Sequence, residues 1–348
     1  INSGVGKKLR DLSAGINRIG VTAEVHLLPA GRRGTRMLAR LLARPNYECV
    51  VLRSDYALVP LFPLLLIQRV KGIRLVLDIP TPRSVSWNEL AFHRGITIKK
   101  LAKAALIAVQ GPLLNPVFNT VLTYAPEGSY WFSMFGADRL IQTSNGIDVG
   151  SRPLRTPRRR APASDSIHLL GLGMLWESRG ADRVIRGIAS YRREPGAVPI
   201  KAILTGPPSA DRARLEELIK ELDLTEAVTT LDLVDGSQLD DLFSWADLGI
   251  GGLAHHRKGL TAASPLKHRE YLARGLPIVF AGIDTAISPE LEIAISVPES
   301  DSPLDVRFVV DSLEALMRDE NMTLKCRQYA LTHLDVGVTV IPHILNVA

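Results

Sequence analysis

The stretch Gly251–Gly282, GGLAHHRKGLTAASPLKHREYLARGLPIVFAG, decides the fold of this 348-residue chain. It starts at the end of a short apolar strand, Leu248–Ile250, passes through a basic loop and continues into a helix predicted over Leu266–Arg274. Gly275 ends that helix, and a second apolar strand follows over Ile278–Ala281. A strand, a helix and a strand in this order predict a βαβ unit, with a right-handed crossover and a parallel sheet.

The same alternation of short apolar strands and amphipathic helices runs through the whole chain. Further strands are predicted at Glu24–Leu28, Cys49–Leu52, Arg74–Ile79, Thr120–Leu122, Arg139–Gln142, Ile167–Leu170, Ile200–Leu204 and Val228–Leu231. Helices are predicted at Lys7–Ile19, Ile98–Val109, Ala181–Tyr191, Ala210–Leu222 and Ser237–Ala246. The fold class is therefore α/β, with ligands expected beyond the carboxyl ends of the strands.

A Pro- and Arg-rich segment without apolar periodicity, residues 151–166, predicts a linker between two domains. We expect a Rossmann-like domain over 1–150, a second over 167–325, and a helical segment over 326–348 that packs back across the junction. Arg158, Arg159 and Arg160 are interpreted as solvated linker residues. The chain opens at Ile1 on a glycine-containing segment, so we expect that a first strand precedes it.

The composition is typical of a globular protein, with 46% apolar and 22% charged residues. The two cysteines, Cys49 and Cys326, predict reduced, buried thiols, although one disulfide between them is the alternative. No secretory signal is recognisable. The longest uncharged run, residues 104–126, is broken by prolines and asparagines and does not predict a membrane span. These features favour a cytoplasmic protein, with no membrane-spanning helix.

The charge is unevenly distributed along the chain. Residues 1–164 carry 24 Lys/Arg and 9 Asp/Glu, a net charge of +15, whereas the remainder carries 18 and 27, a net charge of −9. A basic first half favours an anionic partner, either a phosphate-bearing acceptor or an anionic membrane surface to which the protein binds peripherally. A solvated basic surface is the alternative. Nucleic acid is not expected, because no basic motif is interleaved with aromatic residues.

The start of the predicted helix at Leu266 is a candidate diphosphate site, because free N–H groups and the helix dipole attract anions. Ser264 is the predicted N-cap of this helix. Glu270 lies in the next turn, where its carboxylate can accept hydrogen bonds from ribose hydroxyls. Positive charges crowd the same point: Arg257, Lys258, Lys267 and Arg269. An ordinary helix with solvated charges is the alternative explanation.

Through several motifs the second half resembles the nucleotide-binding domain of retaining, family-four-type glycosyltransferases of the GT-B fold. The resemblance runs through LLGLGMLWESRGADRVIRGIASY at 169–191, ILTGPP at 203–208, RLEELIKELDL at 214–224 and EYLARGLPIV at 270–279. NGID, at 145–148, is another mark of those enzymes. The combination of LDIPTP at 77–82, the segment Trp176–Arg183 and SPLKHREYLARGLP at 264–277 resembles a branch found in bacterial capsule and cell-surface polysaccharide synthesis.

The resemblance implies roles for individual residues. Glu270 stands where the family has the second glutamate of a pair, which contacts the donor ribose. Arg179 stands in place of a diphosphate-binding lysine, and the arginine that usually accompanies it falls on Met174. Lys267 or Lys258 would then supply the second charge. The first glutamate of the pair falls on Ala262, so the usual carboxylate contact to the donor sugar is absent.

Candidates for the acceptor side lie in the first half. NSGVGKK, at residues 2–8, does not have the spacing of a nucleotide-triphosphate loop and predicts a flexible loop around Gly6 before a helix. Thr81, Arg53 and Glu89 are further candidates for acceptor contacts. The histidine that many members place in the first domain has no clear match here.

The implied reaction moves a sugar, of hexosyltransferase type, from a nucleoside-diphosphate sugar to a hydroxyl of a glycan or lipid-linked acceptor. The donor is a substrate, and no metal or other cofactor is expected. His255 and His256 have no ligand partners at metal-binding spacing, so a phosphate contact or a surface role is expected for them. Two other functions stay open: a nucleotide-sugar epimerase of the same fold, and a non-catalytic GT-B partner subunit, because Met174 and Ala262 depart from the family pattern.

Overall fold

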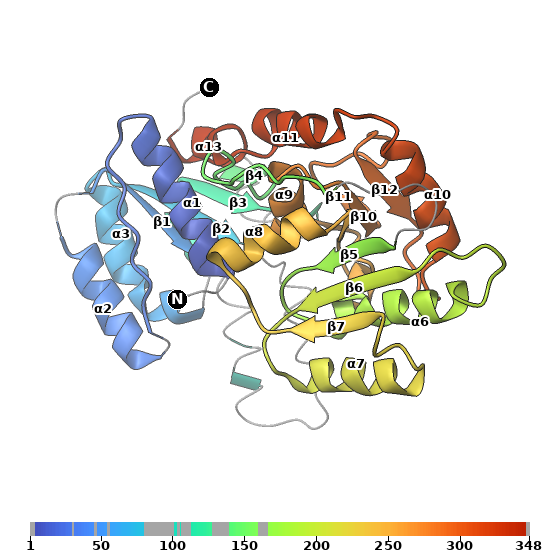
Figure 1. Cartoon of the computed structure of the whole chain (residues 1–348). Helices are drawn as coiled ribbons and strands as arrows, with labels where there is room; N and C mark the ends of the chain where they lie inside the picture. Colours follow the sequence, from blue (N-terminus) through green and yellow to red (C-terminus); the bar gives the residue numbers. More distant parts are fainter. Residues whose placement is uncertain are drawn as a thin grey trace. The chain divides into compact units, whose positions relative to one another are not determined.

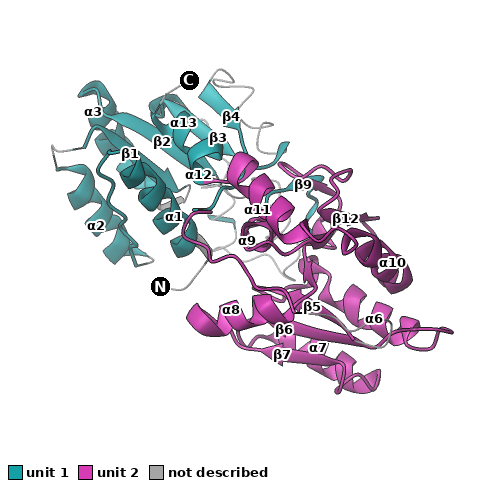
Figure 2. Ribbon diagram, turned by 45° about the horizontal axis from the view of Figure 1, so that its top comes forward, with its two compact units in different colours: residues 1–148, 258–264, 336–348 teal, residues 149–257, 265–335 magenta. Residues whose placement is uncertain are grey.

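The computed structural model of the chain describes residues 4–29, 31–44, 47–53, 56–79, 101–102, 105, 113–126, 139–158 and 166–345. It divides into two compact units, which Figure 2 shows in different colours. Unit 1 comprises residues 1–148, 258–264 and 336–348, and unit 2 comprises 149–257 and 265–335. In each unit, helices flank a sheet of parallel strands (Figure 1), so the predicted α/β class with two Rossmann-like domains is confirmed. Segment 258–264 belongs to unit 1, which the predicted boundaries did not anticipate, and so does 336–348, part of the segment that was predicted to pack back across the junction.

Unit 1 is built on a parallel sheet in the order β1-β2-β3-β4. Its strands are β1 (Cys49–Arg53), β2 (Arg74–Ile79), β3 (Thr120–Thr123) and β4 (Leu140–Gln142), and the short β9 (Ala262–Ala263) also belongs to this unit. Its helices are α1 (Gly4–Arg18), α2 (Arg32–Leu42), α3 (Phe62–Val70), α12 (Val336–Thr339) and α13 (Ile341–Leu345), with 3-10 turns η1 (Tyr56–Leu61) and η2 (Asn115–Val117).

The two faces of this sheet bury different helices. Leu75 and Leu77 of β2 pack in one core with residues of α2 and α3, whereas Val76 packs in a second core with α1, α12 and α13. Successive residues of a strand point to opposite faces, so one strand serves both cores. The carboxyl-terminal segment of the chain therefore helps to close the core of unit 1.

Unit 2 is built on a six-stranded parallel sheet in the order β12-β10-β8-β5-β6-β7. Its strands are β5 (Ile167–Gly171), β6 (Ile200–Thr205), β7 (Val228–Leu231), β8 (Leu248–Ile250), β10 (Ile278–Ala281), β11 (Ile283–Asp284) and β12 (Ala294–Val297). Its helices are α6 (Ala181–Tyr191), α7 (Ala210–Glu221), α8 (Gly236–Trp245), α9 (Leu266–Ala273), α10 (Val306–Leu316) and α11 (Met322–His333), with 3-10 turns η5 (Glu177–Arg179) and η6 (His255–Lys258).

The strand order of unit 2 has a switch point between β5 and β8. From β5 the chain adds β6 and β7 on one side, and then returns to place β8 on the other side of β5. The loops that follow β5 and β8 therefore diverge at the carboxyl edge of the sheet. This is where open α/β sheets bind their ligands.

Helix α9 is fixed to the sheet by one tyrosine. The Tyr271 hydroxyl accepts a hydrogen bond from the backbone N–H of Leu172 at 2.8 Å, and the carbonyl oxygens of Leu170 and Ile250 lie at 3.0 and 3.2 Å from it. The side chain is fully buried, and an added Cβ at Gly249 would come within 2.7 Å of its ring. Tyr271 thus joins α9 to the carboxyl ends of both β5 and β8.

Most predicted elements are confirmed within a residue or two, but three predictions fail. Glu24–Leu28 forms no strand: its side chains are exposed or half-buried, and no strand in the described part of the chain pairs with it. Gly6 lies in the first turn of α1 and not in a loop, because the helix begins at Gly4. The predicted helix Ile98–Val109 lies mostly outside the described residues.

The third failure concerns the predicted linker, whose described residues 151–158 are bound to unit 2. The Arg155 guanidinium is buried and donates to the Gly275 carbonyl at 3.0 Å, and Arg158 pairs with Asp247 at 2.8 Å. Arginine side chains hold the segment in place, which explains why it has no apolar periodicity. Arg159 and Arg160 lie outside the described residues.

Cys49 and Cys326 are both free thiols, as predicted; Cys326 is buried and Cys49 is half-buried. Burial raises the pKa of both thiols, that of Cys326 to about 12. None of the helices in the described ranges has the length and apolar character needed to cross a bilayer.

Replacing Tyr271 with Phe is expected to lower the free energy of unfolding by about 1–3 kcal/mol, because the Leu172 N–H would be left buried without its acceptor. Urea denaturation followed by tryptophan fluorescence measures this change. Tyr329→Phe is the control: among the described residues its hydroxyl bonds only to the Ala286 carbonyl, and the side chain is half-buried. Equal stability of Tyr271→Phe and the wild type would refute the anchoring role.

Candidate functional site

Three basic side chains of unit 2 lie close together after β5, after β8 and at the start of α9. Arg179 ends the 3-10 turn η5, His255 begins η6, and Lys267 is the second residue of α9. Arg179 lowers the pKa of both His255 and Lys267, which shows that the three groups are within electrostatic reach of one another. We call Arg179, His255 and Lys267 the cationic cluster.

The cationic cluster has little negative charge to compensate it. Burial lowers the pKa of the Arg179 guanidinium, which forms no hydrogen bond or ion pair with any residue that the structure describes. Burial, followed by Arg179, holds the pKa of Lys267 well below its usual range, and among the described residues its ammonium donates only to the Gly251 carbonyl, at 2.7 Å. Unpaired cations away from water are costly, so this position favours an anion.

His255 adds an unsatisfied nitrogen to the cluster. Its side chain is 8% exposed, and its Nε2 has no hydrogen-bond partner among the described residues. Burial, followed by Arg179, His268 and Lys267, holds its pKa well below the usual value, so the imidazole is neutral at pH 7. A neutral imidazole can donate a hydrogen bond to a phosphate oxygen. The structure gives no sign of a metal role, since no group of three His, Cys, Asp or Glu in the described ranges could hold an ion.

The loop after β8 is held by a second histidine. The Gly252 N–H donates to His268 Nε2 at 2.9 Å, so the ring proton lies on Nδ1, which donates to Asp284 at 2.8 Å. Burial is the main cause that lowers the pKa of His268 to about 4. The rings approach the backbone so closely that an added Cβ would lie 2.5 Å from His268 at Gly251 and 2.0 Å from His255 at Gly252. Both positions therefore require glycine.

Two of the arginines predicted to face the diphosphate are neutralised inside unit 2. Arg269 is fully buried and forms a bidentate ion pair with Asp284, whose carboxylate it keeps ionised. Arg257 donates to Asp182 through two nitrogens, at 2.8 and 3.0 Å, and to Asp301 at 2.8 Å, and its hydrogen bonding to Asp182 is the main cause that raises its pKa. The expectation that Arg269 adds net positive charge to the site is wrong. A donor contact from Arg257 stays a prediction.

Glu270 is buried and already serves two arginines. One carboxylate oxygen accepts from Arg152 Nε at 3.1 Å, and the other accepts from Arg274 Nε at 2.8 Å. A ribose contact would be a further hydrogen bond to this carboxylate, which has about four lone-pair sites. Removing the carboxylate would take one partner from each of two buried guanidinium groups, although Arg274 would keep its ion pair with Asp240. The ribose contact stays a prediction.

Ser264 has a different structural role from the one predicted. Pro265 occupies the N-cap position of α9 and no side chain caps the helix, so the capping prediction is wrong. Instead, Ser264 Oγ accepts from the Asn145 backbone N–H at 2.7 Å, and its carbonyl accepts from the Asn145 amide at 2.6 Å. These bonds lie within unit 1, to which Ser264, Ala262 and half-buried Lys258 belong. Leu266 is the first helical residue, as predicted.

Unit 1 holds a buried cluster that the sequence did not reveal. The Lys8 ammonium pairs with Asp78 at 2.9 Å and lies 3.8 Å from the centre of the Tyr124 ring. Arg53, one of the predicted acceptor contacts, ends β1 with its guanidinium 3.7 Å from the second Asp78 oxygen. Burial opposes ionisation of Asp78, but Lys8, Tyr124 and Arg53 keep its pKa below the usual value. Thr81 and Glu89 lie outside the described residues.

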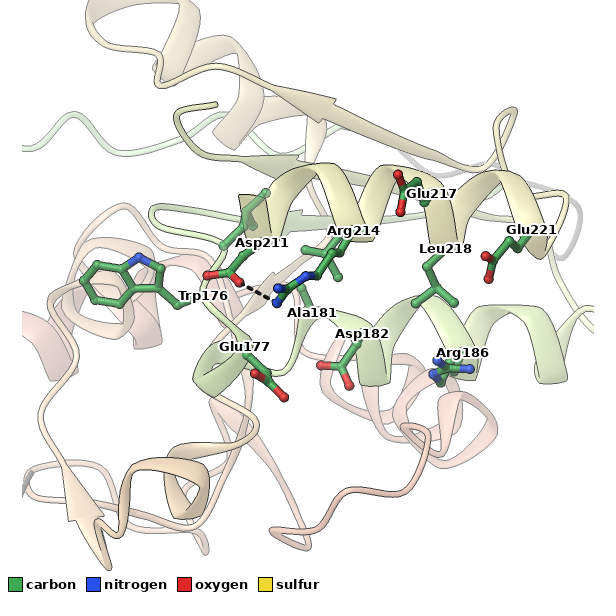
Figure 3. A pocket seen from close by; sticks show the side chains of 12 residues that line it. Trp176, Glu177, Ala181, Asp182, Arg186, Asp211, Arg214, Glu217, Leu218 and Glu221 are labelled. Carbon is green, nitrogen blue, oxygen red and sulfur yellow. Dashed lines mark hydrogen bonds and ion pairs between the residues drawn. The ribbon is translucent and has the colours of Figure 1, made fainter. Parts of the chain in front are cut away.

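A groove of about 280 Å³ between α6 and α7 is a different feature of unit 2 (Figure 3). Trp176 stands at one end, and Arg214 forms an ion pair with Asp211 at 3.4 Å along its wall. The lining also includes Glu217 and Glu221, so carboxylates outnumber cations there. An acidic lining repels a diphosphate, and the groove does not include the cationic cluster.

No protein-family model and no curated protein matches the chain. Solved structures do: sucrose-phosphate synthase from Thermosynechococcus elongatus is similar, with a TM-score of 0.68 and 14% identity over 99% of this chain and 92% of that one. HepE from Anabaena, in complex with UDP and glucose, is similar with a TM-score of 0.66 and 15% identity, over 100% of this chain and 95% of that one. A glycosyltransferase from Rickettsia africae is similar with a TM-score of 0.61 and 11% identity, over 100% of this chain and 96% of that one. At these identities the likeness establishes the fold, the two-domain GT-B fold of glycosyltransferases, as predicted.

Lowering the pH from 6.5 to 5 is expected to reduce the contribution of His268 to the free energy of unfolding by about 2 kcal/mol. The unfolded imidazole binds a proton near pH 6.5, whereas in the folded protein it does so only near pH 4, so stability falls with pH across this window. Urea denaturation at both pH values measures the loss. His268→Gln, which keeps a donor and an acceptor but does not titrate, should lose about 2 kcal/mol less. An equal loss in both proteins would contradict the assignment.

Proposed function

We propose that this protein is a glycosyltransferase that moves a sugar from a nucleoside-diphosphate sugar to a hydroxyl acceptor. The observation that carries the proposal is the cationic cluster, Arg179, His255 and Lys267, at the switch point of the unit 2 sheet. Ligands of open α/β sheets bind at that point, and the cluster is complementary to a diphosphate. The fold supports the same proposal, since solved GT-B structures hold UDP-glucose in HepE and ADP in starch synthase IV from Arabidopsis thaliana.

Each cluster residue has a role in the proposed reaction. The Arg179 guanidinium and the Lys267 ammonium stabilise the negative charge that grows on the diphosphate as the bond between the sugar and the phosphate oxygen breaks. His255 donates a hydrogen bond to a phosphate oxygen. The backbone N–H groups at the start of α9, from Leu266 on, lie at the positive end of the helix dipole. Glu270, in the second turn of α9, accepts a hydrogen bond from a ribose hydroxyl of the donor.

The reaction is proposed to retain the configuration of the sugar. A new bond forms between the acceptor oxygen and the anomeric carbon on the face from which the diphosphate leaves, and the departing phosphate takes the acceptor proton. This route needs no protein nucleophile. The family resemblance supports a hexosyl donor and a glycan or lipid-linked acceptor of bacterial cell-surface polysaccharide synthesis. The two free thiols and the net positive charge of residues 1–164 support a cytoplasmic location, at an anionic membrane surface.

An epimerase of the same fold would need carboxylates or ionisable histidines to move a proton on the sugar. In the surroundings of the cationic cluster that the structure describes, the carboxylate of Asp284 is bound by Arg269 and His268. The low pKa of His255 leaves its imidazole neutral and weakly basic. These features favour glycosyl transfer over epimerisation.

Replacing Arg179 with Ala is expected to weaken UDP binding about tenfold or more, because a hydrogen bond to a charged group contributes about 1.5–3 kcal/mol. Isothermal titration calorimetry with UDP measures the dissociation constant. Arg214→Ala is the matched control, since Arg214 is exposed and lines the acidic groove of the same unit.

The proposal predicts that Arg214→Ala binds UDP as the wild type does, and that Lys267→Met resembles Arg179→Ala. A panel that includes ADP and GDP identifies the base if UDP itself does not bind. Unchanged affinity of Arg179→Ala for the nucleotide that the wild type binds would show that the diphosphate lies elsewhere. Release of a free epimerised sugar without an acceptor would favour the epimerase.

A further inference from the structure

Helices α2 and α3 of unit 1 share a buried side and present two different outer faces. Their inner residues, among them Leu42 and Leu65, belong to one apolar core, with Leu38 packed against it. The two helices lie side by side at one end of the unit 1 sheet (Figures 1 and 2). Because the inner faces are satisfied by the core, the outer faces are free to contact something else.

The outer face of α2 is strongly basic. Exposed arginines recur along the helix and its end at Arg32, Arg33, Arg36, Arg40 and Arg44. Residues 31–44 contain no acidic residue, and none of these arginines forms an ion pair with a residue in the described part of the chain. The stretch therefore carries five positive charges on one helical segment that no described acidic side chain neutralises.

The outer face of α3 is apolar. Leu66, Ile67 and Val70 are 43%, 50% and 81% exposed, and their spacing places them on one face of the helix with exposed Pro63. Single exposed apolar residues are common, but a helical stripe of them beside a basic helix is not explained by folding. Lys71 follows the stripe directly and is also exposed.

We propose that the outer faces of α2 and α3 form a docking surface for an anionic lipid bilayer, with the α2 arginines on the headgroups and Leu66, Ile67 and Val70 in the interface. Basic residues next to an exposed apolar stripe are the combination by which peripheral helices bind anionic lipid. A second copy of the chain docked on the same surface would bring ten arginines together, and their like charges would repel one another. A nucleic acid would leave the apolar stripe without a partner, since the stripe has no aromatic side chain for bases to stack on.

This surface specifies which residues bind the membrane proposed above. It rests on the proposed function only because that function gives the protein a reason to bind a membrane. The experiment is therefore run without nucleotide or acceptor. The intact chain is sedimented with vesicles of phosphatidylcholine alone and of an equal mixture of phosphatidylcholine and phosphatidylglycerol. Binding is expected only to the mixed vesicles.

Two variants separate the contributions of charge and of apolar contact. Arg36→Glu with Arg40→Glu should weaken binding more than tenfold, because each basic residue near an anionic surface contributes about fivefold. Leu66→Ser with Val70→Ser should leave binding that disappears between about 0.1 M and 1 M salt, where the Debye length falls from about 10 Å to 3 Å. The wild type should keep part of its binding at the higher salt, because apolar insertion is not screened.

Matched controls come from unit 2: Arg193→Glu with Arg214→Glu for charge, and Leu324→Ser with Leu331→Ser for exposed apolar residues. Both should bind as the wild type does. Equal binding to neutral and mixed vesicles, or equal losses in the α2 variant and its unit 2 control, would overturn the proposal. The proposal would also be overturned if the wild type did not bind vesicles but bound a short RNA, or formed a dimer in ultracentrifugation, and the α2 variant abolished that binding or dimer. UDP affinity in the α2 and α3 variants should be unchanged, which keeps this outcome separate from the donor site.

Discussion

Tyr271 holds α9 against the sheet of unit 2, and the position of the candidate site depends on that contact. Its hydroxyl bonds to backbone groups at the carboxyl ends of β5 and β8, the two strands between which the strand order of the sheet reverses. Arg179 follows β5, His255 follows β8, and Lys267 stands at the start of α9 itself. One buried hydroxyl therefore ties together the three elements that supply the cationic cluster.

The electrostatics of unit 2 leave the cluster uncompensated. Asp284 is consumed by Arg269 and His268, and the carboxylate of Glu270 is shared by Arg152 and Arg274. Each of these acids makes a structural ion pair. The ion pairs stabilise the loops around the cationic cluster, but they do not reduce the positive charge of the cluster. Burial, followed by repulsion from Arg179, holds the pKa of Lys267 below its usual range. A bound diphosphate would compensate the charge of the cluster, which is why the site favours such a ligand.

The fold was predictable from the sequence because strands and helices alternate with clear apolar periodicity, as from Ile167 to Ala281. Glu24–Leu28 has the composition of a strand but no described partner, and pairing is a tertiary property that composition does not record. Single positions in the site were predictable by motif, such as Arg179 and Lys267. Their partners were not: nothing in the sequence shows that Asp284 neutralises Arg269.

The same limit applies to unit 1. Lys8 and Asp78 are 70 positions apart, and only the parallel sheet and α1 bring them to 2.9 Å. The basic character of the first half was visible as a net charge. Its concentration on α2, and the neutralisation of Arg152 and Arg158 within unit 2, became visible only with the contacts. A count of charges cannot separate paired arginines from unpaired ones.

Proton uptake on nucleotide binding tests the central claim most directly. If a diphosphate compensates the cationic cluster, it must raise the pKa of Lys267 back toward the usual lysine value, so UDP binding measured over a pH series below 10.5 should take up protons from the solution. Calorimetry in two buffers of different ionisation enthalpy counts them. The account predicts uptake of up to about one proton in the wild type and its loss in Lys267→Met. Binding of UDP by the wild type without any proton uptake would contradict it.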